Sequence, residues 1–472
     1  MKRTKIVATL GPSSIKSRVL EKMLYQGVNV FRVNFSHGSA EENRKTILKI
    51  QAILKKTKRH AAILADLQGP KLRIGTVEEG AFLDPGDLMT FTNKPCSGTK
   101  EKVFMTYDSF PKDVKVGEMI LLDDGKLLMR VVSSNSKNEV IAETIQGGPL
   151  KSNKGVNLPN TRVSLPCLTD KDIYDLNIAL DAGVDWVGLS FVRGKQDIKN
   201  LRKIINEKKS SAGIIAKIEK PEAVSDIDAI LDETDAVMVA RGDLGVEVPM
   251  ESVPLIQKMI ISKAISRAKP VIVATQMMES MINSLTPSRA EVNDVSCAVI
   301  DGADAVMLSA ETSVGQYPVE VVEAMSKIVK ASELSSVTRI KGRKPQPEDK
   351  SFVSNALCYQ AAKTANLVEA RSICALTFSG YSAKLISSFR PKSNVYVFTS
   401  NRSILNKLCL FWGVTGFYYD SMESTDQTFV EISKMLKSLS LIEDGDTIIQ
   451  LASMPIKKRG MTNTMRIKQI GA

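Results

Sequence analysis

The feature that most constrains the fold of this chain is a repeat of short apolar runs, each followed by a segment with helical periodicity. Eight such runs occur, at residues 6–10, 28–35, 61–67, 185–192, 213–218, 236–240, 270–276 and 305–309. Continuous apolar runs are typical of parallel strands, which are buried on both faces of a sheet. Eight strand-then-helix units are the number found in a TIM barrel. The repeat therefore predicts an α/β fold built on a (β/α)8 barrel.

The segments between the runs carry apolar residues at helical spacing, as the helices of such a barrel require. The pattern predicts helices at residues 18–26, 40–56, 171–182, 198–208, 222–231, 254–267, 289–300 and 319–332.

The repeat is interrupted after the third run, where short strand patterns replace helices. These patterns lie at residues 89–92, 103–107, 119–122, 127–133 and 139–145, and Asp124-Gly125 between two of them is a strong hairpin signal. We expect residues 70–166 to form a small, β-barrel-like lid domain that is inserted into the barrel. The barrel itself would consist of residues 1–69 and 167–338. Insertions at the carboxyl face of such barrels often act as lids.

A basic, proline-containing stretch at residues 338–350 follows the barrel and is typical of a linker. Beyond it, strand patterns at 372–377, 394–399, 414–418, 447–451 and 465–469 again alternate with helical segments. Residues 339–472 are therefore expected to form a separate α/β domain.

Histidine and cysteine usage narrows the chemistry. The chain has only two histidines, His37 and His60, and its six cysteines show no Cys-x-x-Cys spacing. Most zinc sites are thereby excluded, so carboxylates must hold any catalytic metal, which favours a hard ion such as Mg²⁺ or Mn²⁺. The cysteines are expected to be reduced, and no run approaches the 18 apolar residues of a membrane span. We expect a cytoplasmic protein.

The formal net charge of +12 raises the question of a nucleic-acid partner. The basic residues are spread along the chain, however, and aromatic residues make up only 5%, which leaves little material for base stacking. We therefore expect small anionic substrates and no nucleic acid.

Polar residues follow six of the eight predicted strands, at the barrel end where active sites lie. They are Arg32, Asn34, Ser36 and His37 after the second strand, Asp66, Gln68, Lys71 and Arg73 after the third, Lys217 and Glu219 at the fifth, Arg241, Gly242 and Asp243 at the sixth, Thr275 at the seventh, and Ser309 and Glu311 at the eighth.

Each of these residues also has a plainer interpretation. Lys217 and Glu219 are two apart and face the same side of a strand, where they could bind one ligand or simply pair at the barrel rim. Glu219 and Asp243 could share a divalent ion, or Asp243 could pair with Arg241. His37 could contact a ligand or serve as a hydrogen-bonded structural residue.

Arginines suit bidentate binding of phosphate or carboxylate, and Arg32 and Arg73 follow neighbouring strands, although either could be a surface residue. The chain has no P-loop and no Rossmann fingerprint, so a bound nucleotide needs another cradle.

Several motifs in order resemble the pyruvate kinase family along the whole chain. They are KIVATLGPS (5–13), FRVNFSHG (31–38), KGVNLP (154–159), AKIE (216–219), ARGDLG (240–245), ATQM (274–277) and MLSAET (307–312). Any one of them would be weak evidence, but the full set in this order is specific. The resemblance implies transfer of a phosphoryl group from phosphoenolpyruvate to ADP, giving pyruvate and ATP in the last step of glycolysis.

The resemblance also implies roles for the strand-end residues. Glu219 and Asp243 would bind Mg²⁺ or Mn²⁺, and Lys217 would stabilise charge on the phosphoryl group and on the enolate it leaves. Arg32 and Arg73 would hold the phosphoryl group. The substrate carboxylate would be received by Gly242, Asp243 and Thr275, the nucleotide would be contacted by Asn34, Phe35, Ser36, His37, Arg73 and Lys154, and enolate protonation would involve Thr275, Ser309 or Glu311.

The third strand end departs from a common family pattern. Many members have Asp-Thr-Lys-Gly-Pro-Glu there and need K⁺, whereas this chain has DLQGPK at 66–71 and resembles members that do not. Lys71 could bring a tethered charge to the place of the monovalent cation, for which Asn34, Ser36, Asp66 and Leu67 remain as ligands. We therefore expect activity without K⁺.

The predicted carboxyl-terminal domain carries TFSGYS at 377–382, between a strand and a helix. Thr377, Ser379, Gly380 and Ser382 resemble the phosphate-binding loop of an effector site in the family, with residues 460–463 nearby; an ordinary helix cap is the alternative. The effector would be a sugar phosphate or a nucleotide. Family members are usually homotetramers, and we expect the same here.

Two other functions fit the same barrel. A lyase or aldolase acting on pyruvate-like acids could use the same lysine and carboxylates, but it would need neither the lid nor Lys154. A metabolite sensor that kept only the fold would be expected to lose the charged set, which is intact at Lys217, Glu219 and Asp243.

Overall fold

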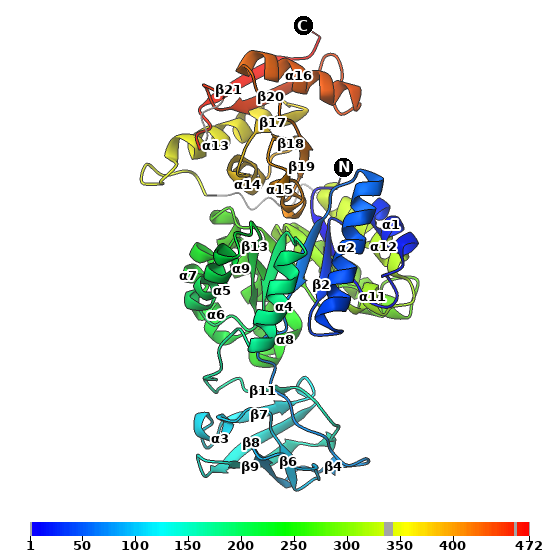
Figure 1. Ribbon diagram of the computed structural model, residues 1–472, viewed down its shortest axis with the longest axis vertical. Helices are drawn as coiled ribbons and strands as arrows, with labels where there is room; N and C mark the ends of the chain where they lie inside the picture. The colour runs from blue at the N-terminus through cyan, green and yellow to red at the C-terminus, as the bar shows by residue number, and fades with distance from the viewer. Residues whose placement is uncertain (1, 335–342, 457–459, 472) are drawn as a thin grey trace.

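The structure is a computed structural model, and it describes residues 2–334, 343–456 and 460–471. Three parts follow one another along its long axis (Figure 1). The barrel lies in the middle, the inserted β-rich lid lies at one end, and the carboxyl-terminal part lies at the other. The predicted boundary at 338/339 and the first part of the predicted linker fall in 335–342, outside the described residues.

The middle part is a closed barrel of eight parallel strands, which confirms the predicted TIM barrel. Apolar runs at several positions extend past the strands, because the residues beyond the ends, such as Val28, Phe35 and Leu67, are buried under loops. In barrel order the strands are β1 (Lys5–Thr9), β16 (Ala305–Leu308), β15 (Val271–Ala274), β14 (Ala236–Ala240), β13 (Gly213–Ile218), β12 (Trp186–Leu189), β3 (Ala62–Asp66) and β2 (Val30–Asn34).

Helices form the outer layer of the barrel, and three of them begin with a capping box, at Ser39, Thr169 and Ser288. The helix predicted at 222–231 is instead two helices, because Asp226 leaves helical geometry (φ −95°, ψ 16°) and its carboxylate accepts a hydrogen bond from the amide of Lys195 at 3.1 Å. The barrel helices are α1 (Ser17–Gln26), α2 (Ala40–Thr57), α4 (Asp170–Asp181), α5 (Lys195–Glu207), α6 (Pro221–Ser225), α7 (Ile227–Glu233), α9 (Val253–Ser266), α10 (Arg289–Asp301) and α12 (Pro318–Leu334), with two short helices, α8 (Arg241–Glu247) and α11 (Ala310–Ser313), at strand ends.

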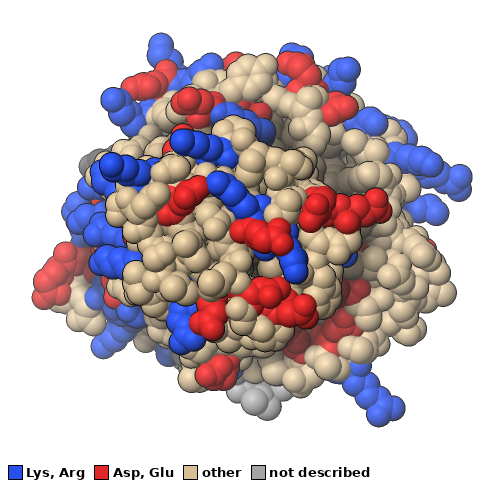
Figure 2. Space-filling model, turned by 90° about the horizontal axis from the view of Figure 1, so that it is seen from below, with Lys and Arg blue, Asp and Glu red and all other residues tan. Residues whose placement is uncertain are grey.

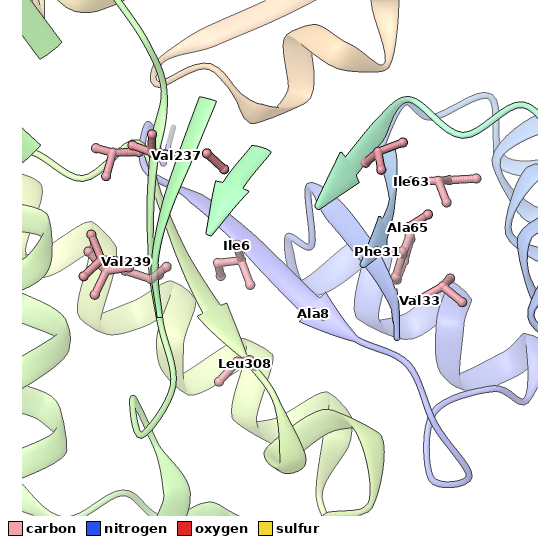
Figure 3. Close-up of a cluster of buried hydrophobic side chains, with 14 of the residues drawn as sticks. Ile6, Ala8, Phe31, Val33, Ile63, Ala65, Val237, Val239 and Leu308 are labelled. Atoms are coloured by element: carbon pink, nitrogen blue, oxygen red, sulfur yellow. The ribbon is translucent and has the colours of Figure 1, made fainter. Parts of the chain in front are cut away.

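The barrel strands divide their side chains between two cores, because alternate residues of a strand face opposite sides. Ile6, Ala8 and Phe31 face outward against the helices, where Figure 3 shows them with their neighbours on adjacent strands. Val7 and Leu64 belong to a second, inner cluster that fills the barrel. A strand buried on both sides explains why the runs are continuously apolar.

The lid is a curled, six-stranded sheet with a small two-stranded sheet beside it. The antiparallel pairing of β7 with β8 around residues 123–126 confirms the hairpin predicted at Asp124-Gly125. Strands of only two residues were not predicted, because so short a segment carries no periodicity. In sheet order the strands are β11 (Val156–Asn157), β7 (Met119–Leu122), β8 (Leu127–Ser134), β9 (Glu139–Gln146), β5 (Leu88–Thr92) and β6 (Lys102–Phe104), with β10 (Gly148–Pro149) and β4 (Phe82–Leu83) apart and one turn of helix, α3 (Phe110–Asp113).

The carboxyl-terminal part is a five-stranded sheet in which only the last strand, β21, runs antiparallel. Its Leu410 and Phe411 pack into the inner barrel cluster, and Arg390 pairs with Asp304 of the barrel at 3.0 Å. This part therefore closes the end of the barrel opposite the lid (Figure 1). Its elements are α13 (Phe352–Leu367), β17 (Ser372–Leu376), α14 (Tyr381–Ser388), β18 (Asn394–Thr399), α15 (Arg402–Leu405), η3 (Lys407–Leu410), β19 (Val414–Tyr418), α16 (Thr425–Ser438), β20 (Thr447–Ala452) and β21 (Thr464–Gln469).

Lys and Arg side chains lie among Asp and Glu side chains on the face seen from the lid end (Figure 2). None of the helices in the described ranges is long and apolar enough to cross a membrane.

Candidate active site

The ammonium group of Lys217 lies at the carboxyl end of β13 with three oxygens around it. Its Nζ donates to Ser190 Oγ at 2.7 Å, and it lies 2.9 Å from Glu219 Oε1 and 3.3 Å from Asp66 Oδ1. Three neighbouring strands meet here, because β3, β12 and β13 are adjacent in the barrel. We call Lys217, Glu219, Asp66 and Arg32 the lysine cluster.

Arg32 joins the cluster from the next strand, β2. Its Nε donates to Asp66 Oδ2 at 2.6 Å and its Nη1 donates to Thr9 Oγ1 at 2.9 Å. Asp66 is fully buried. Burial alone would raise the pKa of the Asp66 carboxyl, but the charges of Lys217 and Arg32 outweigh it and hold that pKa below its ordinary value.

The same electrostatics keep Lys217 protonated. Burial would lower the pKa of its ammonium, but the carboxylates of Asp66 and Glu219 outweigh that effect and raise the pKa above its ordinary value. Lys217 is therefore a fixed positive charge in a place with little water.

Glu219 and Asp243 are the two carboxylates predicted to hold a metal. Glu219 is buried, and its Oε2 accepts the amide of Phe191 at 2.7 Å. Burial raises the pKa of Glu219, and the negative charge of Asp243 raises it further against the effect of Lys217. The alternative that Lys217 and Glu219 form an ion pair holds in part, since the two side chains do pair. The alternative that Asp243 pairs with Arg241 does not hold among the described ion pairs, because Arg241 pairs with Asp294 at 2.7 Å.

Thr275 follows β15 in a strained conformation, with φ at +72°. A β-branched residue rarely adopts this region, and such strain persists only where the surroundings enforce it. Thr275 Oγ1 accepts the amide of Gly242 at 2.7 Å, and the Thr275 carbonyl accepts Arg241 Nη2 at 2.7 Å. The structure thus brings together Thr275 and Gly242, both of which are expected to receive the substrate carboxylate.

The last strand end places Ser309 and Glu311 in contact. Glu311 is buried, and its carboxylate accepts the amide of Ser309 at 2.6 Å and that of Met278 at 3.2 Å. Burial raises the pKa of Glu311. Glu311 therefore ties the loop after β16 to the loop after β15, which carries Thr275.

The residues predicted for the nucleotide are only partly together. Asn34 Oδ1 accepts the amide of Ser36 at 3.1 Å, and His37 is exposed next to them. The Phe35 side chain is fully buried in the outer core, and the carbonyl of Phe35 accepts Lys171 Nζ at 2.9 Å.

Arg73 and Lys154 lie together in the lid. The backbone of Arg73 forms an isolated antiparallel β-bridge with Gly155, and its Nη1 donates to the carbonyl of Asn153 at 2.9 Å. Lys154 Nζ lies 2.8 Å from Asp123 Oδ1. Within the described ranges, neither has a hydrogen bond or ion pair to the lysine cluster. The inserted segment contacts the barrel elsewhere. Asn157 Nδ2 donates to Glu247 Oε1 at 2.8 Å at the end of α8, and the Val163 carbonyl accepts Arg193 Nη1 at 2.5 Å.

The group predicted for a monovalent cation is divided. Asp66 and Leu67 lie at the end of β3, where the Leu67 carbonyl accepts Ser190 Oγ at 2.6 Å. Lys71 is exposed at the start of the lid segment, and among the described contacts it has no ion pair to Asp66.

Sequence reasoning missed Ser190 and Asp294. Ser190 lies near the carboxyl end of the fourth predicted run, at residues 185–192. Its position at a strand end is the same signal that identifies the other candidate residues. Asp294 lies within α10, and its pairing with Arg241 had no signal in the sequence.

Residues 377–382 of the carboxyl-terminal part border a cavity of about 700 Å³. Of the residues expected to form an effector loop, Thr377, Ser379 and Ser382 line this cavity, together with residues 460–462, while Gly380 is not among the lining residues. The Gly380 amide instead donates to Thr377 Oγ1 at 3.0 Å. We call this space the loop cavity.

A barrel that gathers a buried ammonium, a guanidinium and several carboxylates at its strand ends belongs to the enzymes that act on small anionic substrates. Residues 1–322 match the family described as "Pyruvate kinase, barrel domain", and residues 355–468 match "Pyruvate kinase, alpha/beta domain". The chain belongs to the pyruvate kinase family. It is a phosphotransferase that converts phosphoenolpyruvate and ADP to pyruvate and ATP in glycolysis.

Curated relatives match along the whole chain. A pyruvate kinase of Corynebacterium glutamicum is 42% identical over 475 residues, covering 100% of this chain and 98% of the relative, and one of Mycobacterium tuberculosis is 39% identical over 471 residues, covering 100% and 99%. A crystal structure of a pyruvate kinase from Cryptosporidium parvum superimposes with a TM-score of 0.92 at 33% identity, covering 99% of this chain and 96% of that one.

Proposed function

We propose that the lysine cluster is the catalytic centre of this phosphotransferase. The observation that carries the proposal is the buried ammonium of Lys217, held at fixed positions by Ser190, Glu219 and Asp66. In the reaction the bond between phosphorus and the enol oxygen breaks while a bond to an ADP oxygen forms. A preorganised cation stabilises the charge on the phosphoryl group and on the departing enolate without rearranging at the moment of reaction.

Glu219 and Asp243 are proposed to hold the divalent ion, Mg²⁺ or Mn²⁺. The residues fit such an ion, because the negative charge of Asp243 raises the pKa of the buried Glu219 carboxyl, and a divalent charge would relieve this repulsion. Magnesium commonly uses one or two carboxylates and keeps its other positions for water and phosphate. When bound, the ion neutralises charge on substrate oxygens and orients them.

Arg32, Thr275 and Gly242 are proposed to position phosphoenolpyruvate. Hydrogen bonds to Asp66 and Thr9 fix the orientation of the Arg32 guanidinium. A guanidinium held in a fixed orientation is suited to binding a phosphoryl group. The substrate carboxylate would be received by Thr275 and by Gly242 and Asp243 in the first turn of α8. In the described structure the Gly242 amide is bonded to Thr275 Oγ1, so the substrate would take over that hydrogen bond.

Asn34, Ser36 and His37 are proposed to contact the nucleotide from the barrel, and Arg73 and Lys154 from the lid. Phe35 would contribute only through its backbone, since its side chain lies in the core. Closure of the lid would bring Arg73 and Lys154 to the barrel mouth. For protonation of the enolate at its methylene carbon, Thr275 and Ser309 are the candidates, and Glu311 would hold the loops that carry them.

Activity without K⁺ is a further part of the proposal. Asp66, a carboxylate of the monovalent-cation group, already faces the cations of Arg32 and Lys217. Lys71 lies five residues after Asp66, the last residue of β3, where the chain enters the lid. Its charge would reach Asn34 and Ser36 when the lid closes.

The loop cavity is proposed to bind a sugar-phosphate or nucleotide effector through Thr377, Ser379 and Ser382. Ser382 Oγ is buried and has no hydrogen-bond partner among the described residues, which leaves it available to a ligand. We also propose a homotetramer, by analogy with the family, and a cytoplasmic location, with which six free cysteines are consistent.

The experiment that tests the catalytic centre is pyruvate formation from phosphoenolpyruvate, with and without ADP and Mg²⁺. Lys217→Met should lower turnover on the order of a hundredfold or more, as loss of a preorganised charge does in other enzymes. Lys434→Met, on the exposed face of α16, is the control and should leave turnover unchanged. Near-normal turnover in Lys217→Met would refute the assigned role.

A further inference from the structure

A second cavity lies at the other end of the barrel, between the barrel and the carboxyl-terminal part. It has a volume of about 310 Å³. Its barrel wall consists of residues at the amino-terminal ends of strands, such as Trp186 and Gly213, and its other wall consists of the start of α14 with α15 and η3. We call it the interdomain cavity. It is separated from the lysine cluster by the length of the barrel strands.

The charge lining the interdomain cavity is strongly unbalanced. Four cationic side chains line it against a single carboxylate, and they are Arg202, Lys269, Lys384 and Lys407 against Asp235. That carboxylate is already engaged, since Asp235 Oδ2 accepts Arg202 Nη2 at 2.7 Å and the amide of Ile214 at 2.8 Å. Among the lining side chains, the positive charge of the three lysines is therefore left over. Outside the lining, the buried carboxyl of Asp185 also acts on Lys407.

The lysines have few protein partners. Lys269 Nζ donates to the carbonyl of Thr234 at 2.5 Å. Lys384 lies over the ring of Tyr381, 4.9 Å from its centroid, and neither Lys384 nor Lys407 has a carboxylate within salt-bridge distance among the described residues. Burial lowers the pKa of Lys384 and of Lys407, and burial together with the charge of Lys384 lowers that of Lys269. All three lysines are half-buried. Half-buried cations that lie near one another without carboxylate partners favour a bound anion.

An independent observation concerns Trp186. Its side chain is 2% exposed and lines the interdomain cavity, yet its indole Nε1–H has no acceptor among the described residues. A buried donor without an acceptor is uncommon, and indole N–H groups usually find a partner. The lysines and this donor call for the same kind of ligand, one that supplies negative charge and acceptor oxygens.

We infer that the interdomain cavity is a binding site for a small phosphorylated anion, either inorganic phosphate or the phosphate group of a metabolite. A dianion matches the excess of positive charge, and its oxygens can accept from Lys384, Lys407 and Lys269 at once. A neighbouring cavity of about 500 Å³, lined by the same Lys269, Lys384 and Tyr381, gives room for the rest of a phosphate monoester.

The site also borders the loop cavity. Ser379 and Tyr381 line both spaces, so residues 379–381 form a wall between them. Tyr381 is held by its hydroxyl, which donates to Asn355 Oδ1 at 2.7 Å. An anion in the interdomain cavity would fix the position of this wall and of the barrel against the carboxyl-terminal part.

The test uses Trp186 as the reporter. The chain has two tryptophans, so Trp412→Phe leaves Trp186 as the only one. We expect its fluorescence to change saturably on titration with sodium phosphate and with glycerol 3-phosphate. Comparing the two affinities shows whether the site prefers free phosphate or a phosphate monoester. Lys384→Gln and Lys407→Gln should each weaken binding roughly tenfold to a hundredfold, because each removes a charge-assisted hydrogen bond.

Two controls locate the effect. Lys434→Gln removes an exposed lysine of α16, and Ser382→Ala alters the loop cavity alone, so both should titrate like the parent protein. Thermal unfolding of the chain with both tryptophans gives a second reading. Lys384→Gln should raise the midpoint without phosphate, since it removes an unpaired charge, and should lose most of the rise that phosphate causes. Parent-like titration of both lysine variants, or an equal response to sodium chloride at the same ionic strength, would overturn the inference.

Discussion

Arg32 Nε and Asp66 Oδ2 lie 2.6 Å apart across two adjacent barrel strands, and Asp66 is fully buried. Because Lys217 approaches the other oxygen of the same carboxylate at 3.3 Å, one buried negative charge stands between two cations. The ammonium proposed to be catalytic and the arginine proposed to bind phosphate are thus held together by Asp66.

Asp66→Asn is expected to destabilise the protein strongly. The substitution keeps the shape of the side chain but leaves Arg32 and Lys217 as neighbouring buried cations, and breaking a buried pair in this way costs about 3–5 kcal/mol. Urea unfolding measures the loss. The comparison is Glu139→Gln, which breaks the exposed pair with Lys102 and should cost less than about 1 kcal/mol. A small effect of Asp66→Asn would mean that the carboxylate does not hold the two cations.

The sequence predicts the parts of this arrangement that follow from burial along a strand. Strands β13 and β14 lie at the predicted residues, because both faces of a barrel strand are apolar and the pattern stops where the strand ends. Lys217 and Glu219 fall on one side of β13 for the same reason. A periodic pattern thus locates a side chain along the chain and on a face.

Contacts between distant segments have no such pattern. Nothing in the sequence around Asp294 indicates that it binds Arg241. The positive φ of Thr275 is accompanied by hydrogen bonds from Arg241 and Gly242 of helix α8, which no local pattern indicates. The break at Asp226 depends likewise on the amide of Lys195. The position of the Lys71 side chain, which is exposed, likewise depends on the position of the lid.

Arg241 is expected to position Thr275. Its guanidinium donates to both oxygens of Asp294 and to the carbonyl of Thr275, each at 2.7 Å, which an ammonium cannot reproduce. Arg241→Lys should therefore raise KM for phosphoenolpyruvate roughly tenfold or more, the value of one charge-assisted hydrogen bond. Steady-state kinetics check this, and Arg202→Lys, remote from the strand ends that carry Thr275, should leave KM unchanged. An unaltered KM in Arg241→Lys would contradict the positioning role.

Divalent ions are expected to stabilise the protein through Glu219 and Asp243. A ligand bound only by the folded state adds about 2.7 kcal/mol at a concentration one hundred times its dissociation constant. The unfolding midpoint should therefore rise with Mg²⁺ and return on adding EDTA. Asp243→Asn should remove most of this rise, whereas Asp181→Asn, an exposed residue of α4, should not. If Asp243→Asn responds to Mg²⁺ as the parent does, the ion binds elsewhere.

Turnover is expected not to require K⁺. In a buffer with tetramethylammonium as the only monovalent cation, adding K⁺ should change the rate less than about twofold, because the tethered charge of Lys71 is proposed to act in place of the monovalent cation. Lys71→Glu should lower the rate in that buffer, and K⁺ should restore part of it. Lys151→Glu, which changes another exposed lysine of the lid, is the matched control. A large, saturable activation of the parent by K⁺ would refute the proposal.

Asp185 is expected to make stability depend on pH. It lies just before β12 at the barrel end that faces the carboxyl-terminal part, is 9% exposed, and accepts the amide of Ile63 at 2.8 Å. Burial raises the pKa of its carboxyl to about 7, against a partial opposing effect of Lys407. In the unfolded chain an aspartate has a pKa of about 3.9.

The direction follows from these two values. Below about pH 4 the carboxyl is protonated in both states and has no effect, and as the pH rises to about 7 the unfolded state loses its proton first. The parent should therefore lose stability relative to Asp185→Asn across this window, by up to about 4 kcal/mol, since each pKa unit is about 1.4 kcal/mol. Urea unfolding of both proteins at pH 5 and pH 8 measures the difference. Asp181→Asn should show none, and a difference for Asp185→Asn that is equal at both pH values would show that this carboxyl does not titrate in the window.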